Sequence, residues 1–463
     1  MSTNRRKFLK QFGGTTALLT TAGLSSLAQK ERAEQILVWE NKKLSANDRI
    51  NVAVVGCGIM GFQDVASAVS VSGVKLVAAS DLYSGRLTRI KELYGNDVFT
   101  TRHYEDILNR KDVDAVIVAT SDNWHSKICI DALKAGKAVY GEKPVVHKLD
   151  QGLELINTYR QTQKVMQVGS QGISSIAFAK AKELFEQGEI GQINSVEAAF
   201  NRQSALGAWE YTIPSDASPV TVDWERYQQL ADKKFPWDEK RFFWWRNYRE
   251  YGTGVAGDLF VHLLTGLHYV TSAKGPDTIY SIGDLTYWKD GRNVPDVMTS
   301  VLHYPASDQH AAFQVTLRVN FVSGEGETGY TKIIGSDGVM QVDGSGVTVS
   351  RRKMSVAPGI GGWDALSTYP KAMQERLLSD YDKKYSAEEK KAVRLPDLSF
   401  SVPEDYNTHA EHFKNFFLGM RNDKTMIEDP EFGFRAAAPC LCCNESYFEN
   451  KVIHWDAERM KRV

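Results

Sequence analysis

Cysteine, excess charge and long hydrophobic runs are all scarce in this chain. Its five cysteines do not form a disulfide framework over 463 residues. Cys440, Cys442 and Cys443 lie in an alanine-rich apolar stretch, which favours buried helix thiols over a metal or redox site. Beyond the first 28 residues, no apolar run is long enough to span a bilayer. These absences predict a soluble globular protein.

The charge balance argues against nucleic acid as a partner. The chain has 56 basic and 57 acidic side chains and a net charge of −1, which leaves no positive field for a phosphate backbone. Hydrophobic residues make up 42% of the chain, enough at this length to give two domains full cores.

The N-terminus resembles an export signal. Arg5 and Arg6 precede a weakly apolar run that ends at Ser26-Leu-Ala28, a pattern similar to a twin-arginine (Tat) signal peptide over residues 1–28. Such signals export folded proteins, so we expect cleavage near Ala28, a periplasmic location and no other membrane association. Residues 29–47 would form an N-terminal arm. The alternative is a disordered basic N-terminus.

A glycine-rich stretch at residues 51–61 is the clearest motif. An apolar β-branched run leads into Gly56, Gly58 and Gly61, spaced G-x-G-x-x-G, the pattern of a strand that turns into a dinucleotide-binding helix. The first glycine permits the turn, the second lets backbone amides approach a pyrophosphate, and the third lets the helix pack closely. Ile59 and Met60 lie within the same loop. The alternative is a strand and helix with incidental glycines.

An acidic residue follows at the expected distance. Asp81 ends the next apolar run, twenty positions after Gly61, where a carboxylate binds the adenosine ribose hydroxyls. A carboxylate there favours NAD over NADP, although the nearby Arg86 leaves NADP open. Export in the folded state would require the nucleotide to be captured in the cytoplasm, so we expect it to be held tightly.

Residues 48–169 alternate short apolar strands with helical segments, which predicts a doubly wound parallel sheet. Ligands bind beyond the carboxyl ends of such strands, so Asp81, residues 120–125 and residues 141–144 should form one wall of a cleft. The strands that we predict are Asn51–Val55, Val74–Ser80, Val98–Thr100, Ala115–Thr120, Ala138–Tyr140 and Val165–Val168.

Glu142-Lys143-Pro144 directly follows one of these strands. Together with the glycines and the acid upstream, this motif resembles the Gfo/Idh/MocA family of sugar and polyol oxidoreductases. The resemblance implies that Lys143 reaches the substrate beside the nicotinamide and that the Lys143–Pro144 bond is cis. It also places Thr120, Asn123, His125 and Glu142 at the cofactor. The alternatives are a solvent-exposed lysine and a helix cap at Asn123.

Residues 170–400 predict an α+β domain. A helix over Ser175–Gln187 precedes longer alternating strands separated by glycine turns, which indicates a largely antiparallel sheet covered on one face. This arrangement resembles the family's second domain and implies a homo-oligomer formed through the open face. Residues 365–400 are charged and loop-like, resembling an insertion, and residues 401–463 resemble closing helices and a tail that pack back on the core. The predicted strands are Ile193–Asn201, Thr278–Thr286, Val297–Tyr304, Ala311–Phe321, Tyr330–Ile334, Gly338–Val342 and Gly346–Arg351.

The strongest chemical signal in this domain is Asp258-x-x-x-His262. A spacing of four puts both side chains on one face of a helix, where the carboxylate could orient the imidazole and stabilise its charged form. The family resemblance implies that His262 transfers the proton. The alternative is a core histidine. The family's further aspartate, three residues after the histidine, is replaced here by Thr265, which weakens the transfer of any particular substrate.

Five of the ten tryptophans fall between residues 209 and 245. Flat aromatic rings beside an arginine suit a sugar ring, so Trp244, Trp245 and Arg246 are candidate substrate contacts. Loop packing or a subunit interface is the alternative. His409 and His412 have a helical spacing but no evident third ligand, so we expect no metal site.

Together these motifs predict an exported NAD(P)-dependent oxidoreductase that acts on a sugar or sugar derivative, with Lys143, Asp258 and His262 as its catalytic residues. One alternative is a glycosidase that oxidises its substrate transiently with tightly held NAD. Another is a non-catalytic, nucleotide-bound sugar sensor.

Overall fold

The structure is a computed structural model that describes residues 49–422 and 426–463. The expected signal peptide, Arg5 and Arg6 included, and the N-terminal arm lie outside the described residues. Among the helices of the described part, none is long and apolar enough to cross a membrane. All five cysteines are buried and free, and Cys440, Cys442 and Cys443 lie on one helix, as predicted.

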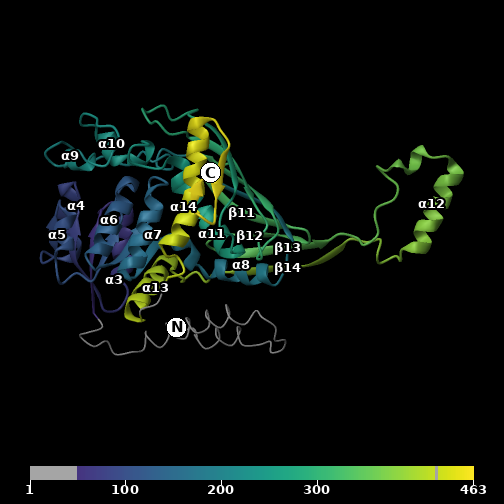
Figure 1. Ribbon diagram of the computed structural model, residues 1–463, viewed down its shortest axis with the longest axis horizontal. Helices are drawn as coiled ribbons and strands as arrows, with labels where there is room; N and C mark the ends of the chain where they lie inside the picture. Colours follow the sequence, from purple (N-terminus) through teal and green to yellow (C-terminus); the bar gives the residue numbers. More distant parts are fainter. Residues whose placement is uncertain (1–48, 423–425) are drawn as a thin grey trace. The chain divides into compact units, whose positions relative to one another are not determined.

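The first domain, which is drawn in purple and blue in Figure 1, is built on a six-stranded parallel sheet, as the alternating pattern predicted. The strand order is β3-β2-β1-β4-β5-β6. Every predicted strand is present, with ends shifted by up to two residues. The strands are β1 (Ile50–Val55), β2 (Val74–Ser80), β3 (Phe99–Thr101), β4 (Ala115–Val118), β5 (Ala138–Glu142) and β6 (Met166–Gly169).

Helices cover both faces of this sheet because its strands are apolar on both faces. In β1, Val52 and Val54 pack into one core with α3 and α4, while Ala53 and Val55 pack into another with α5, α6 and α7. The helices are α3 (Ile59–Val69), α4 (Ser84–Tyr94), α5 (Tyr104–Leu108), α6 (Asp122–Lys134) and α7 (Gln151–Thr162).

The second domain is built on a ten-stranded sheet in the order β14-β13-β12-β11-β7-β10-β9-β8-β15-β16. Its strand pairs are antiparallel except for β7 and β10, which run parallel. The strands are β7 (Ile193–Asn201), β8 (Thr278–Asp284), β9 (Val297–Tyr304), β10 (Phe313–Asn320), β11 (Thr328–Gly335), β12 (Gly338–Val342), β13 (Gly346–Lys353), β14 (Val393–Ser401), β15 (Ile453–Asp456) and β16 (Lys461–Arg462).

Two helices pack on one face of the second sheet. They are α8 (Ile176–Glu186), against β12 and β13, and α14 (Pro430–Glu449), against β8, with α11 (Val261–Thr271) in contact with both. A further helix, α13 (Thr408–Asn422), returns to the first domain, where Phe413, Phe416 and Phe417 join the core formed by α3 and α4.

Residues 365–400 are more ordered than the predicted loop. They contain a 3-10 turn, helix α12 (Lys371–Lys384) and strand β14 at the edge of the sheet. Strand β14 was not predicted because its side chains are all exposed or half-buried. The usual alternation of buried and exposed positions is therefore weak in its sequence.

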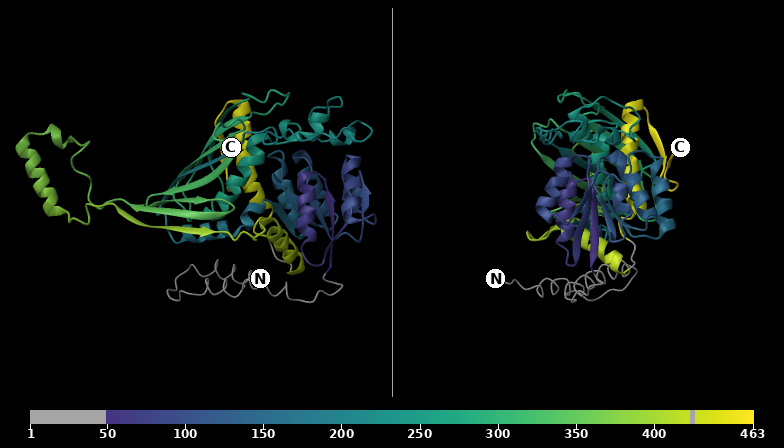
Figure 2. Two further views of the ribbon diagram at one scale, coloured as in Figure 1. Left: turned by 180° about the vertical axis from the view of Figure 1, so that it is seen from behind. Right: turned by 90° about the vertical axis from the view of Figure 1, so that its left-hand side faces the viewer.

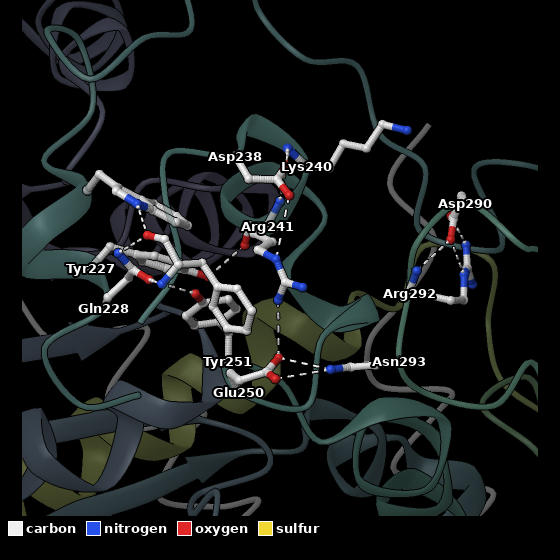
Figure 3. Close-up of polar contacts among 12 residues, drawn as sticks. Tyr227, Gln228, Asp238, Lys240, Arg241, Glu250, Tyr251, Asp290, Arg292 and Asn293 are labelled. Atoms are coloured by element: carbon white, nitrogen blue, oxygen red, sulfur yellow. Dashed lines mark hydrogen bonds and ion pairs between the residues drawn. The ribbon is translucent and has the colours of Figure 1, made fainter. Parts of the chain in front are cut away.

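One long connection of the second domain extends to the first. It comprises residues 202–251 and includes the short helices α9 (Trp224–Tyr227) and α10 (Glu239–Phe243). We call this segment the strap. Hydrogen bonds stabilise the shape of the strap (Figure 3). Glu250 accepts hydrogen bonds from Arg241 and Asn293. The Tyr251 hydroxyl donates a hydrogen bond to the side-chain oxygen of Gln228.

Candidate active site

The glycine turn has the geometry that the motif predicts. Gly56 has φ +90°, and a Cβ there would lie 2.4 Å from the Ala119 carbonyl oxygen. A Cβ on Gly61 would lie 2.0 Å from the oxygen of Gly56, so a side chain at either position would clash with backbone. Gly58 differs, because a Cβ there would meet nothing closer than Arg86, at 3.9 Å. Its backbone therefore faces open space, with Ile59 and Met60 beside it on the same cleft.

Asp81 lies at the end of β2 and is almost fully buried. Its carboxylate accepts hydrogen bonds from the backbone N–H groups of Cys57, at 2.7 Å, and Tyr83, at 2.8 Å. The Arg86 guanidinium lies 3.5 Å away. These contacts fix the carboxylate beside the glycine turn, where sequence analysis expected a ribose-binding acid.

A cleft that is partly open to solvent runs along the carboxyl ends of the parallel strands. At one end it is lined by the glycine turn, Asp81 and Arg86, and at the other by Lys143 and Arg246. The strap forms the wall opposite the parallel sheet. Its lining residues are Tyr211, Arg226, Tyr227, Phe242, Phe243, Trp245 and Arg246.

Several contacts anchor the strap to the first domain. Tyr83 forms a bridge with Val222, and its hydroxyl donates to Asp216 at 2.6 Å. The Trp124 indole donates to the carbonyl of Tyr227 at 3.0 Å. An ion pair between Arg226 and Glu105 adds a further link. The strap, which is a connection of the second domain, is therefore held against the cleft by contacts with the first domain.

Lys143 directly follows strand β5 and lines the end of the cleft that is nearer the second domain. The Lys143–Pro144 bond is cis. The Lys143 Nζ lies 3.0 Å from Asp258 Oδ1, and Arg246 Nε lies 3.2 Å from the same oxygen. Burial alone would raise the pKa of Asp258, but the charges of Lys143 and Arg246 outweigh burial and hold that pKa well below its usual range. Asp258 is thus a buried anion shared by two cations.

This pairing differs from the predicted one. The carboxylate of Asp258, which we expected to orient His262, instead binds Lys143 and Arg246, and no hydrogen bond joins it to His262 among the described contacts. Asp258 lies in a π-helical turn, Ala256–Phe260, that directly precedes α11, and two cations from other segments reach its carboxylate. The acid therefore positions the lysine.

His262 lies on α11 with its ring 6.4 Å from that of Phe200. Burial and the charges of Lys143, Arg202 and Arg246 lower its pKa to about 3, although Asp258 opposes them. The imidazole is consequently neutral at any pH well above that value, and a neutral ring can accept a proton. His262 and Asp258 do not themselves line the cleft described above, which ends at Lys143 and Arg246.

Glu142 is buried directly beside the lysine. Burial raises its pKa to about 7, against the opposing charge of Lys143 and a hydrogen bond from Gln171. Because this folded-state pKa lies above that of an exposed carboxyl, the folded protein holds the proton more tightly than the unfolded chain. The ionisation of Glu142 should therefore lower the free energy of unfolding as the pH rises from about 4.5 towards 7.

We expect Glu142→Gln to remove that cost, because a glutamine keeps an acceptor for Gln171 and cannot ionise. The free energy of unfolding of the variant, relative to wild type, should increase with pH up to about 7 and then level off. Urea unfolding at a series of pH values measures this difference. A difference that does not change with pH would contradict the expectation.

His125 and Asn123 occupy the start of α6. The two His125 ring nitrogens lie 2.8 Å from the Pro144 carbonyl oxygen and 3.1 Å from that of Thr120. The ring thus ties α6 to the Lys143–Pro144 turn while also lining the cleft with Thr120. Asn123 is not the helix cap, because Ser121 holds that position and donates its hydroxyl to the Asn123 side chain.

The tryptophans divide between two roles. Trp245 lines the cleft and stacks under Arg246, with the guanidinium carbon 4.2 Å from the ring centre. Trp244 lies outside the cleft lining and donates its indole N–H to the Tyr211 carbonyl. Trp209 and Trp224 are buried in the core. Of the candidate substrate contacts, Trp245 and Arg246 are therefore the ones that the cleft brings together with Lys143.

Several cleft residues were not predicted from the sequence. They are Tyr211, Phe242 and Phe243, and the last two lie beneath the Arg86 guanidinium. No local motif marks these positions, because the strap brings them to the nucleotide domain from far along the chain. Within residues 49–422 and 426–463, no group of three His, Cys, Asp or Glu side chains is arranged so that it could hold a metal ion.

Comparison with known proteins agrees with this geometry. Residues 50–170 match the Gfo/Idh/MocA model, described as an oxidoreductase family with an NAD-binding Rossmann fold. The matched stretch of the N-terminal domain is therefore similar to this family. It contains the glycine turn, the acid after β2 and the Glu-Lys-Pro motif.

Curated relatives match mainly through this domain. A glycosyl hydrolase family 109 protein of Shewanella sp. (strain MR-4) is 29% identical over 214 residues, covering 42% of this chain and 46% of the relative. An inositol 2-dehydrogenase of Salmonella paratyphi B is 30% identical over 145 residues, covering 31% of this chain and 43% of the relative. The matches therefore span less than half the length of these relatives.

The fold as a whole matches solved structures. A levoglucosan dehydrogenase, solved in complex with NADH and levoglucosan, superposes with a TM-score of 0.59 at 16% identity, covering 88% of this chain and 99% of that protein. The likeness covers the second domain as well as the first, and at this identity it shows a shared fold.

The residues of the cleft fit a nicotinamide dinucleotide. The space beside Gly58 accommodates a group that approaches the backbone amides. The N-terminal domain would therefore hold NAD between the glycine turn, Asp81 and the end of β5.

Proposed function

We propose that this protein is an NAD-dependent oxidoreductase that transfers a hydride between the cofactor and a hydroxyl-bearing carbon of a sugar or sugar derivative. The observation that carries the proposal is the junction of Lys143, Asp258 and Arg246 at one end of a cleft whose other end holds the glycine turn. The similarity to an inositol dehydrogenase supports a polyhydroxylated substrate.

Each residue at this junction has a distinct task. Bound NAD would supply the hydride acceptor. Lys143, held in place by Asp258, would donate a hydrogen bond to the reacting oxygen and stabilise the alkoxide that develops. His262, neutral because its pKa is lowered to about 3, would accept the hydroxyl proton at a ring nitrogen. Trp245 and Arg246 would contact the sugar ring and its hydroxyls.

The strap favours a second candidate, an NAD-dependent glycosidase that oxidises a sugar hydroxyl, eliminates the aglycone and then reduces the product. Anchored at Tyr83, Trp124 and Glu105, the strap would slow the release of the nucleotide. A retained cofactor suits a reaction that restores its own redox state. The similarity to glycosyl hydrolase family 109 supports the same candidate.

One experiment distinguishes the two candidates. The protein is purified and denatured, and any released nucleotide is identified by mass spectrometry. The native protein is then incubated with free sugars and with aryl glycosides. A dehydrogenase forms a keto sugar and reduced nicotinamide together, whereas a glycosidase releases the aglycone with no net reduction. A protein that neither carries nor binds a nicotinamide nucleotide would refute both.

We also propose that the protein is exported in the folded state to the periplasm. The proposal rests on Arg5, Arg6 and the apolar run that follows them. Replacing both arginines with lysine should leave the precursor in the cytoplasm, because the twin-arginine pair is what the export machinery reads. Fractionation of cells expressing each form measures this. Export of the double-lysine variant at the wild-type level would contradict the proposal.

A further inference from the structure

Three basic side chains gather at the end of the cleft that is nearer the second domain, which we call the substrate end. Lys143 and Arg246 line it, and Arg202 directly follows β7. Besides burial, all three charges lower the pKa of His262. Arg202 and Arg246 also oppose the rise that burial causes in the pKa of Tyr211, whose side chain lines the cleft. The three cations therefore surround the place where the substrate would react.

Both arginines belong to the strap. Arg202 is its first residue, and Arg246 lies near its other end. In Figure 2 the strap, drawn in teal, extends from the second domain across the top of the first. The strap thus begins and ends at the substrate end of the cleft, and each of its ends supplies one guanidinium group.

The Arg246 guanidinium is only partly used by the protein. Its Nε donates to Asp258 at 3.2 Å, and Trp245 lies beneath it. Its two terminal nitrogens make no hydrogen bond with the residues that the structure describes, and the side chain is 19% exposed. The terminal nitrogens of an arginine form a planar fork that matches the two oxygens of a carboxylate. Arg246 can therefore bind an anionic group in the cleft.

Arg202 is also available to a ligand. Its guanidinium donates to the Gly207 carbonyl at 2.8 Å and lies 5.4 Å from the centre of the Phe321 ring. Within residues 49–422 and 426–463, no carboxylate forms an ion pair with it. The side chain is half-buried, so its charge is incompletely solvated and gains from an anionic partner.

The carboxylates at the substrate end do not balance these cations. Asp258 is shared by Lys143 and Arg246, and Asp122, which lines the cleft, also acts on Arg246. Glu142 has a pKa raised by burial to about 7, so it is partly protonated at neutral pH. An oxidised nicotinamide ring carries a further positive charge. The substrate end therefore has an excess of positive charge that favours an anionic ligand.

We propose that the substrate is a sugar acid of the hexuronate type, whose carboxylate binds Arg246 and Arg202. This inference rests on the proposed function, because it names the substrate class of the same site. Oxidation moves the hydride of the carbinol carbon to NAD and the hydroxyl proton to His262, and leaves a keto sugar acid with its carboxylate unchanged. A neutral sugar would desolvate both arginines without pairing their charges.

The test compares acidic sugars with their neutral counterparts. Protein saturated with NAD is titrated by calorimetry with D-glucuronate and D-galacturonate, and with D-glucose and D-galactose. At least one hexuronate should bind about tenfold or more tightly than its counterpart, because a hydrogen-bonded charge pair contributes that much. Added salt should weaken hexuronate binding and leave the binding of the neutral sugar unchanged.

Arg202→Gln tests the residue that carries the unpaired charge. We expect it to weaken hexuronate binding about tenfold or more and to leave the binding of neutral sugars unchanged. Arg202→Lys keeps the charge but loses the fork, so its affinity should be intermediate. Arg352→Gln is the matched control, since Arg352 is exposed on β13, and it should bind like wild type. Thermal unfolding and bound nucleotide are recorded for each variant, because Arg202 also binds the Gly207 carbonyl.

Two results would overturn the inference. One is a wild-type protein that binds each neutral sugar as tightly as the matching hexuronate, and the other is tighter binding of D-glucose 6-phosphate than of D-glucuronate, which would replace the carboxylate by a phosphate. The titration requires no turnover, so it decides the substrate class whether or not a sugar in the panel is oxidised. Oxidation of neutral sugars without a preference for hexuronates would overturn this inference alone and leave the proposed oxidoreductase intact.

Discussion

Replacing Lys143 with alanine is expected to lower turnover by about a hundredfold or more, with the nucleotide still bound. The reason is that Lys143 would be the cationic donor at the reacting oxygen, and a preorganised donor of this kind is worth about 10²–10³ in rate. The cofactor is held mainly by the glycine turn and Asp81, which Lys143 does not touch. His262→Ala should have a loss of similar size, since it removes the proposed base.

The controls use residues of the same types at exposed positions. Lys127→Ala removes a lysine from an exposed ion pair on α6, and His454→Ala removes an exposed histidine on β15. Both should leave the rate unchanged. Cofactor occupancy is measured beside each rate, because a variant without nucleotide is inactive for a different reason. Wild-type turnover by the Lys143 and His262 variants, with the cofactor present, would refute the assigned roles.

Replacing Asp81 with alanine is expected to weaken NAD binding by about 10- to 100-fold. The change removes a charged acceptor for the ribose hydroxyls, and a hydrogen bond to a charged group contributes about 1.5–3 kcal/mol. Discrimination against NADP should fall as well, because the carboxylate that repels a ribose phosphate is gone and Arg86, 3.5 Å from it, remains. Titration of nucleotide-free protein with NAD and NADP measures both effects.

Asp81→Asn separates the charge of this residue from its structural contacts. The backbone N–H groups of Cys57 and Tyr83 bind different oxygens of Asp81, so asparagine keeps the acceptor for one of them and loses the other, whereas alanine loses both. NAD affinity should fall less than in the alanine variant, while discrimination against NADP is still lost. If wild type prefers NADP and Arg86→Ala abolishes that preference, Arg86 rather than Asp81 sets the cofactor choice.

Local patterns were sufficient to predict the nucleotide domain. The strands before Gly56 and Asp81 are apolar on both faces, which is a pattern of consecutive residues. The spacing of the three glycines is set by the turn that they form, so it too depends only on neighbouring residues. The alternation in the second domain likewise predicted Ile193–Asn201 and Val297–Tyr304 to the residue. In both cases the information lies within a dozen residues of the element.

The candidate site was predicted less completely because its geometry depends on distant segments. The spacing of Asp258 and His262 suggested a pair, but the carboxylate binds Lys143, which is 115 residues earlier. No local rule favours that partner over the imidazole. The strap presents the same difficulty, since its aromatic residues reach the nucleotide cleft only after both domains have folded.

Residues 365–400 were predicted as a charged, loop-like insertion, and the helix within them was missed. Helix α12 buries no side chain, so the contrast between a buried and an exposed face is weak in its sequence. Its apolar positions, Met373 and Leu377, are exposed to solvent in the structure.

The most direct test of the account is to follow the bound nucleotide itself. Purified wild-type protein is mixed with a panel of sugars, and the near-ultraviolet absorbance of reduced nicotinamide is recorded, with Lys143→Ala as the parallel sample. The account predicts that at least one sugar reduces the bound nucleotide in wild type and is converted to a keto sugar, while the variant reacts at least about a hundredfold more slowly. Equal rates in the two proteins would contradict it, as would a wild-type protein that binds no nicotinamide nucleotide.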